Sequence, residues 1–334
     1  MEVTNTKKSK KGGKFSYSKV NTYESCGWKY YLTYHEKHYI YNESINVDFG
    51  ILIHHIEESI GKALKEGMKP DYGKLKGEFL DINVPKKDKF DTEGGIFGVN
   101  ILKKKYPLEF FAANDRGQSY ATKAQDYLEY GIYRLETYMK ENPDLEVYDL
   151  EKYFSISFGD NVLSGFIDRI FHRKGTNEYI IEDIKTKDKP FKDEDLTTPL
   201  QFVIYAIGLQ NVLGKDISVS CVYDLPILDR KQEAGSGNFI NRGKERLEHI
   251  FAGIDANDFE PHPSPLCAWC PFSPTNENQP EEGKNLCPYY SLWTRGNRTF
   301  KVAHKWEGMD RHPTIMKEEK LKKLRETLGI DFDF

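Results

Sequence analysis

Helical periodicity dominates the first part of the chain. Aromatic residues recur at helical spacing over residues 15–34, where Ser16 or Ser18 is a candidate cap. A second helix is predicted to begin after Gly50, and a long amphipathic helix is predicted over residues 121–140. Residues 66–118 give no consistent pattern.

The pattern changes to strand-like alternation from Leu150 onward. Polar and apolar residues alternate as far as Phe158, and Gly159 with Asp160 then predicts a hairpin turn. Further strands are predicted over residues 162–172, 178–185 and 217–223, and helices over residues 199–213, 241–253 and 313–328. This order of elements predicts an α/β fold in which a mixed sheet is flanked by helices.

Composition excludes some classes of protein. The 334 residues carry a formal net charge of −4, so the chain does not coat nucleic acid by bulk positive charge. No apolar stretch approaches the roughly 18 residues that a membrane-spanning helix needs, and the N-terminus lacks the apolar core of a secretion signal. We therefore expect a cytoplasmic protein without membrane association, located in the host cytoplasm if it is viral.

The most informative stretch joins two carboxylates and a lysine. Side chains in a strand alternate between faces, so Asp183 and Lys185 project from the same face. We expect a hairpin to bring Asp168 beside Asp183, which would create a site of hard oxygen ligands for a divalent metal. Metal ions that polarise a phosphate and activate water, together with a nearby lysine, are what phosphodiester hydrolysis needs.

This triplet has a simpler interpretation as a solvated strand edge, since Asp188 and Lys189 show how often such residues occur in a chain with 30% charged residues. Its surroundings favour the functional interpretation. Ile180, Ile181 and Ile184 indicate a buried strand, in which an unpaired charge is costly.

Five motifs in order resemble those of RecB-like nucleases, a branch of the PD-(D/E)XK superfamily. They are the string Ser16, Ser18, Tyr23, Cys26, Tyr30; Gly50 with His54; Gly165 with Asp168; Asp183 with Lys185 and Thr186; and Gln201 with Tyr205. The resemblance implies a restriction-endonuclease-like fold with a helical insertion and a C-terminal cysteine-rich segment.

The resemblance also implies roles for individual residues. His54, Asp168, Asp183 and the backbone carbonyl of Ile184 would bind Mg²⁺ or Mn²⁺, with Asp168, Asp183 and Lys185 catalytic. His55 is the alternative ligand if the helix has a different phase, although the spacing selects His54. Gln201 and Tyr205 lie four residues apart on one helix face, which the resemblance assigns to DNA binding.

Cysteines form a second candidate site. The odd number of five argues against a disulfide framework, and Cys267 with Cys270 has the spacing of two thiolates on one metal or cluster. Members of the resembling group, which includes AddB and the CRISPR-associated adaptation nucleases, hold a [4Fe-4S] cluster, which implies Cys26, Cys267, Cys270 and Cys287 as ligands. Two alternatives remain. One is a structural Zn²⁺ bound by the three C-terminal cysteines with Cys26 or His262, and the other is free thiols. Cys221, on a predicted strand, is expected to be a buried thiol.

These features predict an organisation and a function. We expect a disordered basic arm over residues 1–14, a RecB-like nuclease domain over residues 15–300, and a C-terminal helix and tail over residues 301–334. Within the domain we expect a helical insertion (60–148), a catalytic core (150–225) and a cluster-binding segment (258–292). The expected function is metal-dependent exonuclease or end-processing cleavage of single-stranded DNA, in recombination, repair or phage DNA metabolism. The alternatives are a structure-specific endonuclease and a catalytically silent nucleic-acid-binding scaffold.

No Walker A sequence accompanies these motifs, because Gly214, Lys215 and Asp216 lack both the upstream glycine and the following Ser or Thr. A helicase or recombination partner would therefore have to supply any motor.

Overall fold

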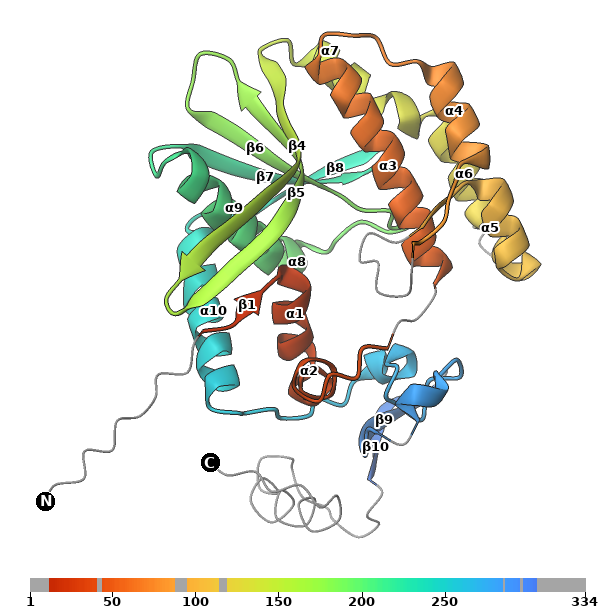
Figure 1. Ribbon diagram of the computed structural model, residues 1–334, viewed down its shortest axis with the longest axis vertical. Helices are drawn as coiled ribbons and strands as arrows, with labels where there is room; N and C mark the ends of the chain where they lie inside the picture. The colour runs from red at the N-terminus through yellow and green to blue at the C-terminus, as the bar shows by residue number, and fades with distance from the viewer. Residues whose placement is uncertain are drawn as a thin grey trace, which may run out of the picture. The chain divides into compact units, whose positions relative to one another are not determined.

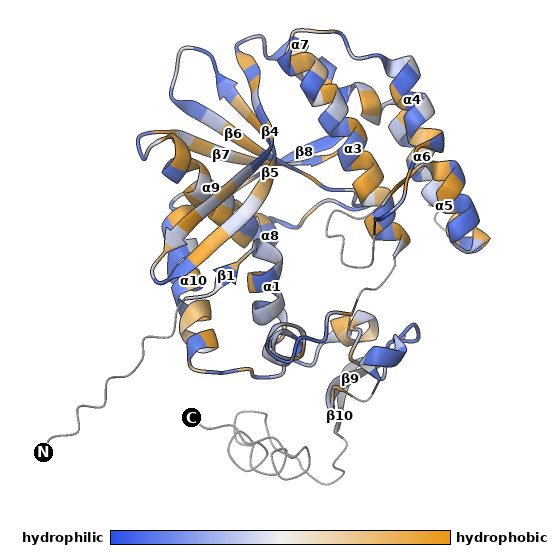
Figure 2. Ribbon diagram, viewed as in Figure 1, coloured by the Kyte–Doolittle hydropathy of each residue, from blue (hydrophilic) through white to orange (hydrophobic). Residues whose placement is uncertain are grey.

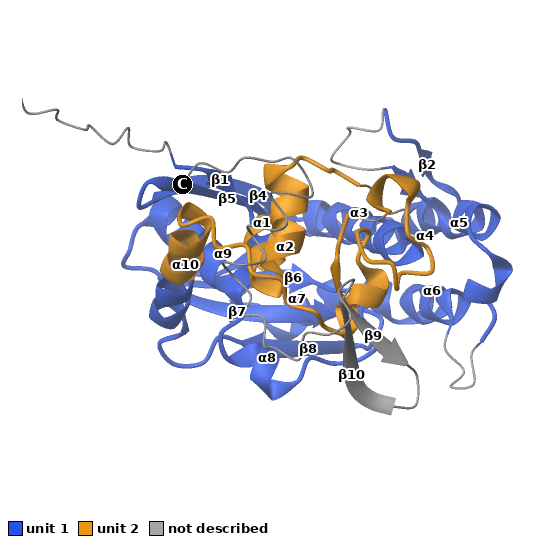
Figure 3. Ribbon diagram, turned by 90° about the horizontal axis from the view of Figure 1, so that it is seen from below, with its two compact units in different colours: residues 1–17, 43–246 blue, residues 18–42, 247–334 orange. Residues whose placement is uncertain are grey.

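A computed structural model describes residues 12–40, 44–87, 95–113, 119–284, 286–294 and 297–304. The chain divides into two compact units, coloured separately in Figure 3. Unit 1 comprises residues 1–17 and 43–246, and unit 2 comprises residues 18–42 and 247–334.

Unit 1 is built on a six-stranded mixed sheet (Figure 1). The strand order is β1-β5-β6-β7-β8, and β4 pairs with the other edge of β5. The strands are β1 (Lys14–Phe15), β4 (Leu145–Phe158), β5 (Asn161–Arg173), β6 (Glu178–Ile184), β7 (Ser218–Leu225) and β8 (Arg230–Ala234). Strands β6 and β7 are parallel, whereas β4 and β6 are both antiparallel to β5. The mixed α/β class predicted from the sequence is confirmed.

The β4–β5 hairpin forms where the alternating pattern predicted it. Phe158 pairs with Asn161, and Gly159 adopts a φ of +59°, which a two-residue turn requires and glycine allows without steric cost. The strands extend further than predicted, because β4 already begins at Leu145. Lys14, which we assigned to the basic arm, begins β1 instead and pairs with Val162.

Helix α3 (Ile45–Lys65) is the longest helix of unit 1 and buries its apolar stripe against the sheet. It begins before Gly50, earlier than predicted, because Ile45 and Phe49 are also buried in the core. Around it lie α4 (Tyr72–Asp81), α5 (Val99–Lys105), α6 (Tyr120–Glu129), α7 (Arg134–Glu141), the short strands β2 (Asn83–Val84) and β3 (Ile96–Phe97), and the turns η2 (Leu108–Phe110) and η3 (Gly131–Tyr133).

The prediction of one long helix over residues 121–140 was wrong. It is broken into α6, η3 and α7. Gly131 stands at the break, and glycine disfavours a helix interior. A β-carbon there would lie 2.9 Å from the carbonyl oxygen of Pro226, so the chain bends where the β7–β8 connection passes closely.

Helix α9 (Leu200–Leu213) connects β6 to β7 together with α8 (Asp193–Thr197). Asp183 contacts α9 and its neighbour Ile184 packs in the α3 core, so the two helices cover opposite faces of the sheet. The segment Asp193–Leu213 is apolar and long enough to cross a membrane by length and composition alone, contrary to the expectation that no stretch qualifies. Burial of α9 from Leu200 through Ala206 accounts for its apolar character, which is visible in Figure 2.

Unit 2 has a small core of its own, formed by Trp28, Tyr31, Leu32, Phe272 and Cys287. The helix predicted over residues 15–34 is interrupted at Cys26, which separates α1 (Tyr17–Ser25) from α2 (Gly27–Tyr30) and the π-helical turn η1 (Tyr31–His35). Helix α10 (Phe239–Asp255) runs across the division between the units. The turns η4 (Pro265–Trp269) and η5 (Glu281–Gly283) and the hairpin β9 (Tyr289–Thr294) and β10 (Asn297–His304) follow. The first eleven residues of the basic arm and the predicted helix over residues 313–328 lie outside the described residues.

Candidate active site

Asp183 lies at the C-terminal end of β6, and Lys185 directly follows the strand. Asp183 is 1% exposed, and the Lys185 ammonium lies 2.5 Å from its Oδ2. Burial raises the pKa of Asp183 to about 6, Lys185 opposes this rise, and the nearby Asp168 adds to it. Burial disfavours the charged ammonium, but Asp183 and Asp168 together raise the pKa of Lys185. The strand therefore presents a carboxylate and an ammonium on one face, as the D-x-K spacing predicted.

Asp168 reaches the same place from β5. Its Oδ2 accepts a hydrogen bond of 2.8 Å from the backbone N–H of Ile184. The β5–β6 hairpin thus joins Asp168 to the strand that carries Asp183, as predicted from the strands expected over residues 162–172 and 178–185.

His54 approaches from α3. Its Nδ1 lies 3.6 Å from Asp168 Oδ2, and its Nε2 donates to the carbonyl oxygen of Ile184 at 3.0 Å. The helix phase therefore directs His54, and not His55, toward the two groups that the resemblance named as its fellow ligands.

Glu151 is the residue that the sequence reasoning missed. In the described part of the chain, it joins His54 and Asp168 in a group whose candidate ligand atoms all lie within 4.8 Å of one another. We call these three residues the ligand group. Glu151 lies within β4 with a φ of +45°, and burial raises its pKa to about 7, with Asp168 adding to the rise and His54 opposing it. A signal was present in the sequence, because Glu151 and Asp168 lie at equal distances on either side of the Gly159–Asp160 turn.

Gln201 and Tyr205 lie on α9 directly behind Asp183. The Gln201 side-chain amide donates to Asp183 Oδ1 at 2.7 Å and to the Tyr205 hydroxyl at 2.8 Å. Taken without the resemblance, both would pass as helix-surface residues, but the structure buries them to 7% exposure each. They hold one carboxylate oxygen of Asp183 in place, which leaves Oδ2 on the side of Lys185.

The donor set fits a divalent cation. Asp183 Oδ2 is buried and has no hydrogen bond of ordinary geometry among the described residues, although Lys185 lies close to it. The carboxylates of Glu151 and Asp168, one imidazole and the Ile184 carbonyl are nearby. Hard oxygen ligands with one nitrogen suit Mg²⁺ or Mn²⁺.

The four predicted cluster cysteines lie together within unit 2. Cys287 belongs to the unit 2 core, and Cys26 and Cys270 pack against that core. Burial raises the pKa of the Cys287 thiol, and Cys26, Cys267 and Cys270 are near enough to add to the rise. Cys26 Sγ accepts a hydrogen bond from the backbone N–H of His262. Cys221, by contrast, is buried on β7, as expected.

Comparison with known proteins defines the class of this chain. The family model described as the PD-(D/E)XK nuclease superfamily matches residues 14–275, so the chain belongs to that superfamily. Its members are nucleases, phosphodiesterases that use divalent metal ions. No curated protein matches the chain.

Two solved structures are distantly similar. One is a protein of Eubacterium rectale provisionally described as an exonuclease, with 13% identity and a TM-score of 0.40 over 81% of this chain and 92% of that chain. The other is a protein named SSO0001, with 20% identity and a TM-score of 0.25 over 43% of this chain and 66% of that chain. At these TM-scores neither structure bears on the function of this chain.

Proposed function

We propose that this chain is a metal-dependent DNA nuclease of the RecB-like branch of the superfamily. The observation that carries the proposal is the convergence of His54, Asp168, Asp183 and Lys185 at one end of β6, from three separate elements. These are the residues that the five ordered motifs select.

The ligand group, with the Ile184 carbonyl and Asp183 Oδ2 beside it, would hold Mg²⁺ or Mn²⁺. When bound, such an ion polarises the phosphate and lowers the pKa of an attacking water. Glu151 is thereby added to the ligands expected from the sequence. The buried position of Asp183 helps to exclude bulk water, which strengthens every electrostatic interaction in the site.

Lys185 acts at the reaction centre. Its ammonium rests against Asp183 Oδ2, and a substrate phosphate brings a competing negative charge to the same position. The raised pKa of Lys185 keeps the ammonium protonated, so it can stabilise charge that develops on the phosphate oxygens. Gln201 and Tyr205 orient Asp183 and border this position, which is our proposal for their part in DNA binding.

The proposed substrate is single-stranded DNA or a DNA end, processed in recombination, repair or phage DNA metabolism. The chain would work alone or beside a helicase or recombination partner. A structure-specific endonuclease uses the same chemistry, so circular single-stranded DNA separates the two, because only an endonuclease cuts a substrate without ends.

The rival from a different class is a silent nucleic-acid-binding scaffold. A digestion assay with Mg²⁺, with Mn²⁺ and with EDTA decides between them. We expect cleavage with either ion, no cleavage in EDTA, and none from Asp183→Ala. Tight DNA binding without cleavage in any of these conditions would support the scaffold and contradict the nuclease.

We also propose that Cys26, Cys267, Cys270 and Cys287 hold a [4Fe-4S] cluster. Cys287 belongs to the unit 2 core against which Cys26 and Cys270 pack, and Cys26, Cys267 and Cys270 are near enough to contribute to the raised pKa of the Cys287 thiol. This gathering of four thiols supports one shared centre. Metal and sulfide analysis separates the cluster from a structural Zn²⁺, which four thiolates can also bind.

A further inference from the structure

A buried ionic network lies on the sheet face opposite Asp183. Arg169 is fully buried and is held by two carboxylates, Glu57 Oε2 at 2.9 Å and Glu182 Oε2 at 2.5 Å. Its guanidinium also donates to the backbone carbonyl of Glu57 at 3.3 Å. Glu57 accepts a further hydrogen bond of 2.8 Å from the Tyr127 hydroxyl. Arg169 thereby ties together α3, β5 and β6.

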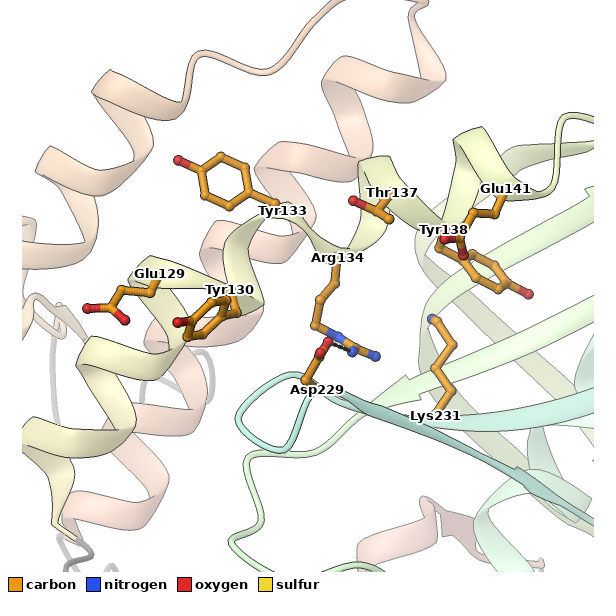
Figure 4. Close-up of a pocket in the computed structure, with 9 residues that line it drawn as sticks. All are labelled: Glu129, Tyr130, Tyr133, Arg134, Thr137, Tyr138, Glu141, Asp229 and Lys231. Atoms are coloured by element: carbon orange, nitrogen blue, oxygen red, sulfur yellow. Dashed lines mark hydrogen bonds and ion pairs between the residues drawn. The ribbon is translucent and has the colours of Figure 1, made fainter.

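The network continues toward the surface through four more residues. Lys231 pairs with Glu182 and with Asp224, and Arg134 pairs with Asp224 and with Asp229. Burial disfavours ionisation of Asp224, but Lys231, Arg134 and Arg169 together hold its pKa below the ordinary value. Figure 4 shows Arg134 directed toward Asp229, in a cavity of about 470 Å³ that Lys231 also lines.

The members of this network are next to the residues of the active site in sequence or in backbone pairing. Arg169 follows Asp168, and Glu182 precedes Asp183. Glu57 lies one turn after His54 on α3, and the Asp224 carbonyl accepts a hydrogen bond of 2.8 Å from the Lys185 N–H. Arg169 and Glu182 also pair directly across the β5–β6 ladder. Asp168 and Asp183 are thus each adjacent in sequence to a residue held by an ion pair. His54 lies one helical turn from such a residue, Glu57, and Lys185 is joined to another, Asp224, by a backbone hydrogen bond.

Stability alone is a poor explanation for such a network. A buried ion pair contributes little net stability, because desolvation of the charges offsets most of their attraction, and apolar residues of similar volume serve a core as well. The guanidinium fork differs from an apolar side chain in geometry, because it fixes two carboxylates in one plane at defined distances.

We propose that Arg169 is a positioning residue for the active site, which sets the mutual placement of His54, Asp168 and Asp183 by holding Glu57 and Glu182 from the opposite face of the sheet. It touches neither substrate nor metal. The inference rests on the proposed function, since it names the device that aligns the same ligands.

Arg169→Lys tests the proposal, because it keeps the charge but removes the fork that binds two carboxylates. The readouts are direct Mn²⁺ binding by calorimetry without DNA, kcat and KM for cleavage, and thermal unfolding. We expect the variant to fold, to bind Mn²⁺ about 10- to 100-fold more weakly, and to lose kcat to a similar extent at fixed Mn²⁺, with KM for DNA nearly unchanged. Tyr127→Phe, which removes only the hydroxyl on Glu57, should show a smaller loss of the same kind and serves if Arg169→Lys does not fold.

Asp48→Asn is the matched control. Asp48 is a buried carboxylate on the same helix, paired with Lys105 at 2.8 Å and with the Tyr106 hydroxyl. The Asp48→Asn substitution should lower the unfolding temperature without changing Mn²⁺ affinity or kcat. Equal Mn²⁺ affinity in wild type, Arg169→Lys and Tyr127→Phe would overturn the positioning role and leave the nuclease intact. A wild type that neither binds Mn²⁺ nor cleaves DNA would instead overturn the proposed function.

Discussion

Glu151 and Asp168 face each other across the β4–β5 hairpin, between the register pairs Leu150 with Arg169 and Lys152 with Ile167. One carboxylate oxygen of each residue and one ring nitrogen of His54 all lie within 4.8 Å of one another. Glu151 takes a left-handed backbone conformation, at φ +45°, that an L residue adopts at a cost of order 1–3 kcal/mol. Backbone strain of this kind clusters at functional sites, which supports a role for the Glu151 side chain in the ligand group.

Replacement of Glu151 should therefore damage the chemistry. We expect Glu151→Gln to lower cleavage by about 100-fold or more, because a neutral amide is a poorer ligand for Mg²⁺ or Mn²⁺ than a carboxylate. Initial rates at several Mn²⁺ concentrations measure this. Asp149→Asn is the control on the same strand, since Asp149 pairs with Lys65 and Lys152 away from the ligand group, and it should cleave normally. Equal rates in the two variants would remove Glu151 from the site.

The residues predicted from the motifs should be essential. Asp168→Ala, Asp183→Ala and Lys185→Ala should each abolish cleavage while folding and DNA binding persist, because these groups hold the metal or act on the phosphate. Circular dichroism and a gel-shift assay check folding and binding. If Asp183→Ala cleaves at the wild-type rate, the assignment of the site is wrong.

The two adjacent histidines provide an internal control on α3. His54→Ala should raise the Mn²⁺ concentration needed for half-maximal cleavage, because Nδ1 and Nε2 of His54 face Asp168 and Ile184. His55→Ala should leave this concentration unchanged. The reverse result would show that the helix phase at the site differs from the one described.

The metal-free protein should lose stability as the pH rises. The pKa of Glu151 is about 7 in the fold against an ordinary 4.5, so the folded state holds a proton that the unfolded state releases. This contribution is complete below pH 4.5 and is lost as the pH rises through 7. Its size is on the order of 1 kcal/mol after allowance for partial exposure.

Urea unfolding in EDTA at about pH 5 and about pH 8 measures the effect. Glu151→Gln should show a shallower decline than wild type. Saturating Mn²⁺ should reverse the trend in wild type, because the cation binds the ionised carboxylates that repel each other without it. A wild-type protein whose stability in EDTA increases over this interval would contradict the assigned shift.

Local patterns predicted the hairpin and the D-x-K strand well. A short connection limits the register of the two strands predicted over residues 162–172 and 178–185, so Asp168 could be placed beside Asp183 from the sequence alone. The Gly159–Asp160 turn likewise places Glu151 opposite Asp168, but the Glu151 side chain reaches the site only through a backbone conformation that strand periodicity does not encode.

Long-range packing explains the predictions that failed. The break at Gly131 depends on the close approach of Pro226, which is distant in sequence. The burial of Gln201 and Tyr205 depends on α9 packing against the sheet, where polar residues spaced four apart look like a solvated helix face. Arg169 and Glu182 likewise look like surface residues in the sequence, but the packing of α3 against the sheet buries both.

The cysteine cluster gives a prediction that is independent of the nuclease site. Binding of [4Fe-4S] would join Cys26 to Cys267, Cys270 and Cys287, and because the unfolded chain has no preformed site, the binding energy becomes folding energy for unit 2. Cys26→Ala should therefore give colourless, protease-sensitive protein, whereas Asp183→Ala should remain brown, folded and inactive. Cys221→Ala should match wild type in colour, since Cys221 lies on β7 in unit 1. Anaerobically purified protein with stoichiometric zinc and no iron or acid-labile sulfide would refute the cluster and leave the nuclease assignment standing, because the two sites use different residues.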